Sequence, residues 1–219
     1  AGAPRGPARP RAAGRGMSVK HVTGALLDFA QAAPAPACYV VHQVSCVYAG
    51  DPAGIAKAVF EKHEAADVYK DRRKRRETEA LADTISAPGS ISVHDGCIVN
   101  LYGQFVADKP MAVREEPSEA ADPEKEAPEL PADLKQFFDC CPDVRDTREQ
   151  RLEWFKAGLR EIPKQLGKEN THLGKDAKLA IPAKIGCGIA GGAWEEYEQA
   201  IREFADEYTD LDISIVARA

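Results

Sequence analysis

The sequence predicts one α/β domain with three layers, in which a mixed central sheet carries helices on both faces. From His21 onward, short apolar runs alternate with helical patterns, as is typical of an α/β sheet. One run, Cys38–Val44, is apolar at both odd and even positions, which indicates a strand covered on both faces. The chain has 219 residues, 44% of them hydrophobic, so one domain with a proper core is expected.

The strands are predicted from short apolar runs that end at glycine, proline or polar residues. Gly24 ends the first strand, and the Asp95-Gly96 dipeptide between the third and fourth strands is a strong signal for a tight hairpin. In chain order, the expected strands are His21–Thr23, Cys38–Val44, Ile91–Val93, Cys97–Phe105, Leu179–Ile185 and Leu211–Ala217.

Three regions show helical patterns. Residues 54–85 are expected to form two helical segments that change direction near Ala65. In the second region, apolar residues repeat at three-to-four spacing until Pro163 is expected to end the helix. The third region carries an apolar stripe that includes Trp194 and Tyr197. The second stripe is Leu152, Phe155, Leu159 and Ile162, and the third continues with Ile201 and Phe204.

Two segments differ in composition from the rest. Residues 1–16 contain four arginines, three prolines and no acid, so we expect a disordered leader, with a transit peptide as the alternative. Residues 17–219 are then a single domain. Within it, an acidic insertion loop is expected at about 108–145, because Arg114–Asp133 holds eight acids and four prolines.

Charge and cysteine content exclude several classes of function. The formal net charge is −6, and removing the four leader arginines gives −6 − 4 = −10, which does not favour a broad nucleic-acid surface. No run approaches the roughly 20 apolar residues of a membrane span. The six cysteines show neither a CxxC pair nor zinc-ligand spacing, so reduced thiols in an intracellular protein, cytoplasmic or nuclear, are expected, with neither metal nor cofactor. Organelle import by the basic leader is the alternative.

Two glycine-containing loops each join a predicted strand to a helix. They are Ser45–Gly54 and Gly186–Gly192 (GCGIAGG). Both would lie beyond the carboxyl ends of strands, where open α/β sheets bind ligands. Free amides in such loops favour anions, and glycine allows close approach of the backbone. We therefore expect a diphosphate to be bound between them. A P-loop is excluded because no Gly-Lys-Ser/Thr follows either loop, and no GxGxxG follows the first strand.

The same loops resemble those of macro domains. Ile181–Trp194, followed by Tyr197, resembles the second ligand loop of the branch that contains ADP-ribose 1″-phosphate phosphatases and terminal ADP-ribose protein glycohydrolases. Val41–Cys46 with Gly54–Ala56 resembles the first ligand loop, and Val22–Leu27 resembles the opening strand with its adenine contact. The resemblance covers about residues 20–217. It implies a macro-type fold and an ADP-ribose ligand, or an ADP-ribosylated macromolecule as partner.

The resemblance also implies which residues contact the ligand. They are Ala25, Leu26, Ser45, Gly50, Asp51, Gly54, Ile55, Ala56, Gly186, Cys187, Gly188, Ile189, Ala190 and Gly191. Two of these have alternatives: Ser45 as a turn hydroxyl and Asp51 as a cap of the next helix.

Three departures from the family pattern bear on activity. Ala25 stands where the family has an aspartate that contacts adenine, and Ala193 stands where an aspartate often precedes the tryptophan. The lysine nucleophile and loop aspartate of the glycohydrolases have no counterpart near Gly103-Gln104 and at Ala190. A lysine-adduct mechanism is therefore not expected.

His42 is the remaining catalytic candidate, because it matches a histidine before the first loop of the phosphatase-like branch. A neutral imidazole near a distal phosphate could act as general acid or base. The alternative is a hydrogen-bonded histidine in a buried strand.

A basic run, Lys70–Arg76, offers two further alternatives. It could bind RNA or an import factor, but we expect a solvated helix face whose charge Glu77 and Glu79 offset.

Three functions remain open from the sequence. The first is a hydrolase, of the ADP-ribose 1″-phosphate phosphatase or ADP-ribosyl hydrolase type. The second is a module that binds ADP-ribose without turnover. The third is a protein-interaction domain that retains the fold and uses its charged segments.

Overall fold

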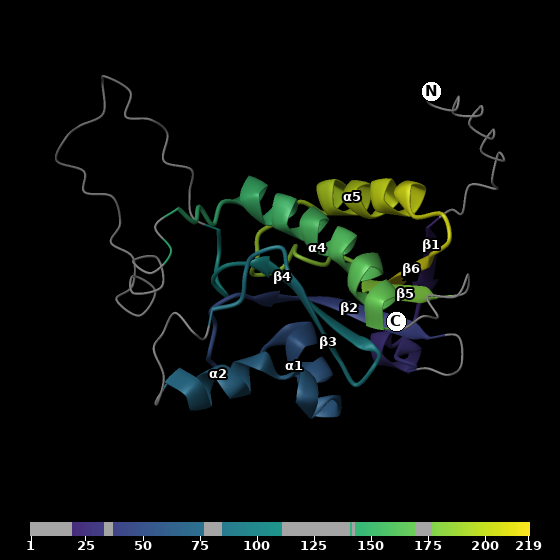
Figure 1. Cartoon of the computed structure of the whole chain (residues 1–219). Helices are drawn as coiled ribbons and strands as arrows, with labels where there is room; N and C mark the ends of the chain where they lie inside the picture. Colours follow the sequence, from purple (N-terminus) through teal and green to yellow (C-terminus); the bar gives the residue numbers. More distant parts are fainter. Residues whose placement is uncertain (1–18, 33–36, 77–84, 111–140, 142, 170–176) are drawn as a thin grey trace, which may run out of the picture.

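The computed structural model describes residues 19–32, 37–76, 85–110, 141, 143–169 and 177–219, which form a six-stranded sheet with helices on both faces (Figure 1). The strands are β1 (Lys20–Thr23), β2 (Cys38–Ser45), β3 (Ile91–His94), β4 (Ile98–Gln104), β5 (Lys178–Pro182) and β6 (Asp212–Ala217). The α-helices are α1 (Gly54–Lys62), α2 (Val68–Arg76), α4 (Arg148–Glu169) and α5 (Trp194–Glu207), and the 3-10 helices are η1 (Leu26–Phe29) and η2 (Glu64–Ala66).

The sheet is mixed, as predicted. Its strand order is β1-β6-β5-β2-β4-β3, and only β3 runs antiparallel to its neighbour. The long strand β2 lies inside the sheet between β5 and β4, and all its residues except Gln43 are buried. A strand in this position has no face in water, which explains why its sequence is apolar at both parities.

Each face of the sheet has its own layer of helices and its own apolar cluster. Figure 1 shows α4 and α5 on one side of the sheet and α1 and α2 on the other. Tyr39 and Val41 of β2 belong to the cluster under α4 and α5, and Val40 belongs to the cluster under α1 and α2. Because alternate residues of a strand point to opposite faces, β2 supplies both clusters. The predicted three-layer architecture is confirmed.

Most of the predicted elements are present. Asp95 and Gly96 have φ of 50° and 65°, which is the positive φ that tight hairpin turns require at both central residues. Residues 54–76 change direction between α1 and α2 through η2, as predicted near Ala65. Residues 1–16, and residues 111–140 and 142 of the acidic insertion, lie outside the described residues. No helix in the described ranges is both long and apolar enough to cross a membrane.

Two predicted boundaries are wrong. Helix α4 continues through Pro163 to Glu169, although proline within a helix costs about 3 kcal/mol. Leu166, one turn beyond Ile162, is 1% exposed and packs in the same cluster, so burial on the sheet offsets that cost. Strand β5 ends at Pro182 and not at Ile185, because Lys184 adopts a φ of 60° and turns the chain.

Candidate functional site

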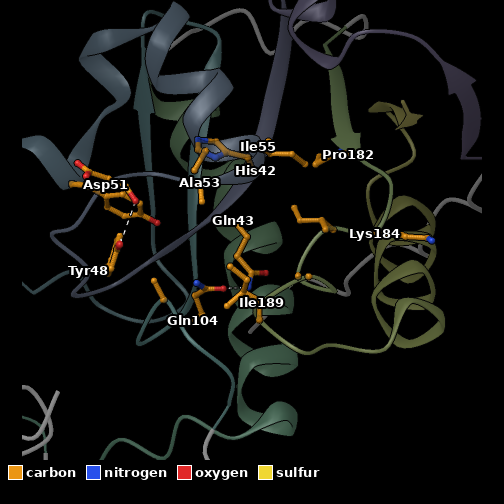
Figure 2. Close-up of a pocket in the computed structure, with 18 residues that line it drawn as sticks. His42, Gln43, Tyr48, Asp51, Ala53, Ile55, Gln104, Pro182, Lys184 and Ile189 are labelled. Carbon is orange, nitrogen blue, oxygen red and sulfur yellow. Dashed lines mark hydrogen bonds between the residues drawn. The ribbon is translucent and has the colours of Figure 1, made fainter. Parts of the chain in front are cut away.

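A cavity of about 400 Å³ lies beyond the carboxyl ends of β2 and β5 (Figure 2). These strands are neighbours in the sheet and run parallel, so the loops that follow them leave the sheet side by side. Of the predicted site residues, the cavity is lined by His42, Asp51, Gly54, Ile55, Ala56, Gly186, Gly188, Ile189 and Ala190. The two glycine-containing loops are thus brought together, as the sequence predicts.

The second loop is a series of tight turns. The Cys187 amide donates to the Lys184 carbonyl (3.0 Å), and the Gly192 amide donates to the Gly186 carbonyl (2.9 Å). Gly186 has a φ of 71°, and a Cβ on it would overlap the ring of Tyr197. Glycine is therefore required at residue 186 both for its backbone conformation and for its close approach to a ring.

The amides of Gly188, Ile189 and Ala190 donate to no acceptor in the part of the chain that the structure describes. Together with the turn geometry, these three consecutive amides form a concave backbone surface with partial positive charge. All three residues line the cavity. The second loop can therefore bind an anion without a charged side chain.

The other wall of the cavity contains the N-terminus of α1. Its N-cap residue, Ala53, offers no side-chain hydrogen bond, and the first-turn residues Gly54, Ile55 and Ala56 line the cavity. Uncapped amides at a helix N-terminus attract negative charge. Asp51 does not cap this helix, so its alternative role as a cap is wrong, and it lines the cavity.

Cationic side chains contribute little to the cavity itself. Lys184 is the lysine among the lining residues, and Figure 2 shows its side chain directed away from the cavity. The Asp51 carboxylate carries negative charge on the opposite wall. A bound diphosphate would therefore rely on backbone amides, as the acidic composition indicates. No group of three or more His, Cys, Asp or Glu side chains among the described residues is placed to bind a metal ion.

Large apolar side chains are exposed at the cavity on both sides. Ile55 is 41% exposed and Ile189 is 61% exposed, and both line the cavity, one from each wall. Exposure of such side chains to water is unfavourable unless something covers them. An apolar part of a ligand would bury them.

His42 is held in a single orientation beneath the cavity. Its Nε2 lies 2.6 Å from Asn100 Oδ1, and Asn100 Nδ2 donates to the Ala66 carbonyl (2.9 Å). Because Asn100 therefore accepts through Oδ1, His42 carries its proton on Nε2, and its buried Nδ1 has no partner among the described atoms. Burial lowers the pKa of His42 to about 4. The ring is neutral at pH 7, so a role as imidazolium acid is not favoured.

Ser45 supports the first loop from within. It is fully buried, its hydroxyl donates to the Phe105 carbonyl (2.6 Å), and the hydroxyl oxygen accepts from the amides of Val47 (3.2 Å) and Tyr48 (3.0 Å). The alternative role of Ser45 as a turn hydroxyl is thus present in the structure, and Ser45 is not among the residues that line the cavity.

Five other predicted contacts lie outside the cavity lining. Ala25 and Leu26 follow β1 and are not among the residues that line the cavity. The other three residues, Gly50, Cys187 and Gly191, make hydrogen bonds that stabilise the loops. Gly50 accepts from Arg73 through its carbonyl, Cys187 donates from Sγ to the Ile185 carbonyl (3.2 Å), and the Gly191 amide donates to the Gly188 carbonyl (3.0 Å).

Polar and aromatic side chains that the sequence prediction missed also line the cavity. Gln43 Nε2 donates to Gln104 Oε1 (3.1 Å), and Figure 2 shows this pair between the two walls. Gln43, next to His42, is a polar residue within a mostly apolar strand, and this interruption was the available signal. The missed lining residues are Gln43, Tyr48, Ala53, Tyr69, Gln104, Ala107, Pro182, Lys184 and Ile185.

A buried ion pair supports the second loop. Arg151 Nε lies 2.5 Å from Asp146 Oδ1, and the two side chains are 1% and 0% exposed. Arg151 also donates to the carbonyls of Ala190 (3.1 Å) and Asp108 (2.7 Å). Asp146 in turn accepts from the Val106 amide (2.9 Å). Helix α4 is thereby tied to the second loop and to the segment after β4.

The basic run is not wholly a solvated face. Arg72 is 5% exposed and donates to the carbonyls of Ser45 (2.6 Å) and Tyr48 (3.3 Å), which belong to the first loop. The predicted solvated face is therefore wrong at Arg72, because α2 packs against the back of this loop. The side chains of Lys74, Arg75 and Arg76 lie outside the described part.

Gly186→Ala is expected to destabilise the protein by about 1–3 kcal/mol, because the methyl group would overlap the Tyr197 ring at a left-handed φ. Gly188→Ala is the matched control, since nothing lies within 4 Å of a Cβ there, and it should change stability by less than about 0.5 kcal/mol. Urea unfolding measures both. Equal effects of the two substitutions would contradict the geometry of this loop.

The free energy of unfolding should decrease as pH falls from about 6.5 toward about 4. In this window the unfolded chain protonates His42 while the folded chain keeps it neutral, so acid favours unfolding, by at most roughly 1.4 kcal/mol per pH unit. His42→Gln should flatten this dependence in urea titrations. Thr209→Ala, at an exposed residue that does not titrate, is the control and should leave the slope unchanged. An unchanged slope in His42→Gln would show that His42 titrates normally.

No protein-family model matches the chain, and no curated protein matches it. Solved structures do. A protein of unknown function from Bacteroides thetaiotaomicron matches with a TM-score of 0.56 and 17% identity, over 93% of this chain and 99% of that one. The macrodomain of Mycobacterium tuberculosis DarG matches with a TM-score of 0.54 and 17% identity, over 92% of this chain and 98% of that one. The macrodomain of Thermus aquaticus DarG matches with a TM-score of 0.50 and 17% identity, also over 92% of this chain and 98% of that one. The chain therefore has the α/β fold of these macrodomains.

Proposed function

We propose that the cavity binds ADP-ribose or an ADP-ribose derivative, with the diphosphate on the backbone amides of the two loops. The observation that carries this proposal is the convergence of two sets of free amides on one cavity. One set is Gly188–Ala190, and the other is the uncapped first turn of α1. Such surfaces stabilise phosphate groups through partial charges and hydrogen bonds.

Size and apolar character also support an organic nucleotide over a simple anion. A cavity of about 400 Å³ is in the range of small-molecule sites, which is roughly 300–1,000 Å³. The exposed side chains of Ile55 and Ile189 would be covered by the sugar or base portions of such a ligand. ADP-ribose is the member of this class that the resemblance of the loops implies. The shared fold with macrodomains agrees with it.

ADP-ribose is expected to raise the melting temperature. A ligand at 100 times its Kd stabilises by about 2.7 kcal/mol, which corresponds to roughly 5–10 °C for a chain of this size. Scanning calorimetry with ADP-ribose tests this, with adenosine monophosphate as the comparator that lacks the diphosphate. If millimolar ADP-ribose produced no shift, ADP-ribose binding would be rejected for both the reader and the hydrolase.

Hydrolysis is a second candidate, and Asp51 is the observation that favours it. Its side chain is exposed at the cavity wall, and its carboxylate makes no hydrogen bond or ion pair to a described residue. A carboxylate near a bound distal phosphate or ribose could activate or orient a water molecule. His42, buried and neutral, would then position groups on the cavity floor. We infer that a hydrolase of this chain would depend more on Asp51 than on His42.

If the chain is a phosphatase, it releases phosphate from ADP-ribose 1″-phosphate, and Asp51→Asn should lower that rate by about 100-fold or more. Asp28→Asn is the matched control, because Asp28 is exposed on η1 outside the cavity lining. A colorimetric phosphate assay on the two folded variants measures the difference. An unchanged rate in Asp51→Asn would remove Asp51 from the mechanism, and ligand binding without phosphate release would favour the reader.

A further inference from the structure

The first loop is attached to α2 through its carbonyl groups. Arg72 donates from Nη1 to the Ser45 carbonyl (2.6 Å) and the Tyr48 carbonyl (3.3 Å), and Arg73 donates to the Gly50 carbonyl. Arg72 is further fixed by Nη2, which donates to Ser86 Oγ (2.8 Å). Its guanidinium also lies 5.5 Å from the centre of the Tyr102 ring. Two arginines of one helix therefore donate hydrogen bonds to three carbonyls of one loop.

The direction of each carbonyl fixes the direction of the next amide. In a trans peptide unit, the C=O and the N–H point in opposite directions. With the Tyr48 and Gly50 carbonyls turned toward α2, the amides of Ala49 and Asp51 point away from that helix. Neither amide has an acceptor among the described residues. The carbonyl oxygens, which would repel an anion, are kept behind the loop, while the amides remain available on its other side.

Arg72 also differs from Arg151 in charge balance. Arg151 is paired with the carboxylate of Asp146, whereas no described carboxylate pairs with Arg72. A buried guanidinium remains protonated, and a buried charge without a counter-ion is unfavourable. Burial also lowers the pKa of Arg72, and the rings of Tyr69 and Tyr102 lie beside it. An anion bound at the adjacent loop would interact favourably with this positive charge.

We propose that Arg72, assisted by Arg73, is a positioning residue for the diphosphate site: it holds the carbonyls of the first loop away from the cavity and supplies a positive charge behind the loop. This inference rests on the proposed binding of ADP-ribose. It adds to that proposal a determinant in the basic run, outside both glycine-containing loops. The guanidinium does not need to touch the ligand.

The test compares Arg72→Met with Arg160→Met, the same substitution at an exposed arginine on the opposite face of the sheet. Calorimetric titration of each folded variant with ADP-ribose and with adenosine, which lacks phosphate, gives the preference for ADP-ribose as a ratio of Kd values. Melting temperatures are measured in parallel. We expect Arg72→Met to reduce the preference at least tenfold and Arg160→Met to leave it unchanged. A merely structural role would lower the melting temperature but leave the ratio unchanged.

Two further variants keep the test decisive if Arg72→Met does not fold. Arg72→Lys retains a charge but cannot span the same acceptors, and Arg73→Met removes the donor to Gly50. Each should reduce the preference about threefold. A preference equal to wild type in the folded variants would overturn the role of Arg72. Absence of ADP-ribose binding by wild type would overturn the proposed function itself, so the two failures are distinguishable.

Discussion

Arg151 and Asp146 form an ion pair that is almost completely removed from water. Removing either partner would leave a buried charge uncompensated, which typically costs about 3–5 kcal/mol. The pair joins α4 to the loop after β5 through the Ala190 carbonyl and to the segment after β4 through Val106 and Asp108. Its hydrogen-bonding groups are shared among three segments that are distant in sequence. The shape of the cavity wall therefore depends on an interaction formed beneath it.

The same arrangement recurs at the first loop with different chemistry. Arg72 donates hydrogen bonds to loop carbonyls on the side away from the cavity, as Arg151 does, but it has no carboxylate partner among the described residues. In both loops, positive side chains lie under the backbone and not in the cavity, where Lys184 also points away. An acidic chain can in this way present a locally positive surface made of peptide amides. Because the positive charge lies under the loops, the cavity is lined by backbone, by exposed apolar side chains such as Ile55 and Ile189, and by polar and aromatic groups.

The sequence predicted the fold well because its signals are local. The apolar character of β2 at both odd and even positions, the Asp95-Gly96 turn and the apolar stripe of α5 each depend on residues that are close in sequence. Each of these features is present in the structure. The loops were also found, since glycine after a strand is a local signal. The hydrogen bonds that support the loops were not predicted. Arg151 and Ala190 are 39 residues apart in the sequence, and Arg72 and Ser45 are 27 residues apart, and nothing near either arginine in the sequence indicates its partner. The sequence also could not tell that Ala25 and Leu26 do not line the cavity, because the cavity walls are formed by loops that the strand order brings together.

The central claim is that backbone amides of both loops bind the diphosphate. Titration of ¹⁵N-labelled protein with ADP-ribose, followed by amide chemical shifts, tests it most directly. The account predicts the largest shifts at Gly188, Ile189 and Ala190 and at Ile55 and Ala56, from the two walls of one cavity. Arg202, on α5 and away from the cavity lining, should show none. Saturable binding that left the amides of both loops unshifted would contradict the account.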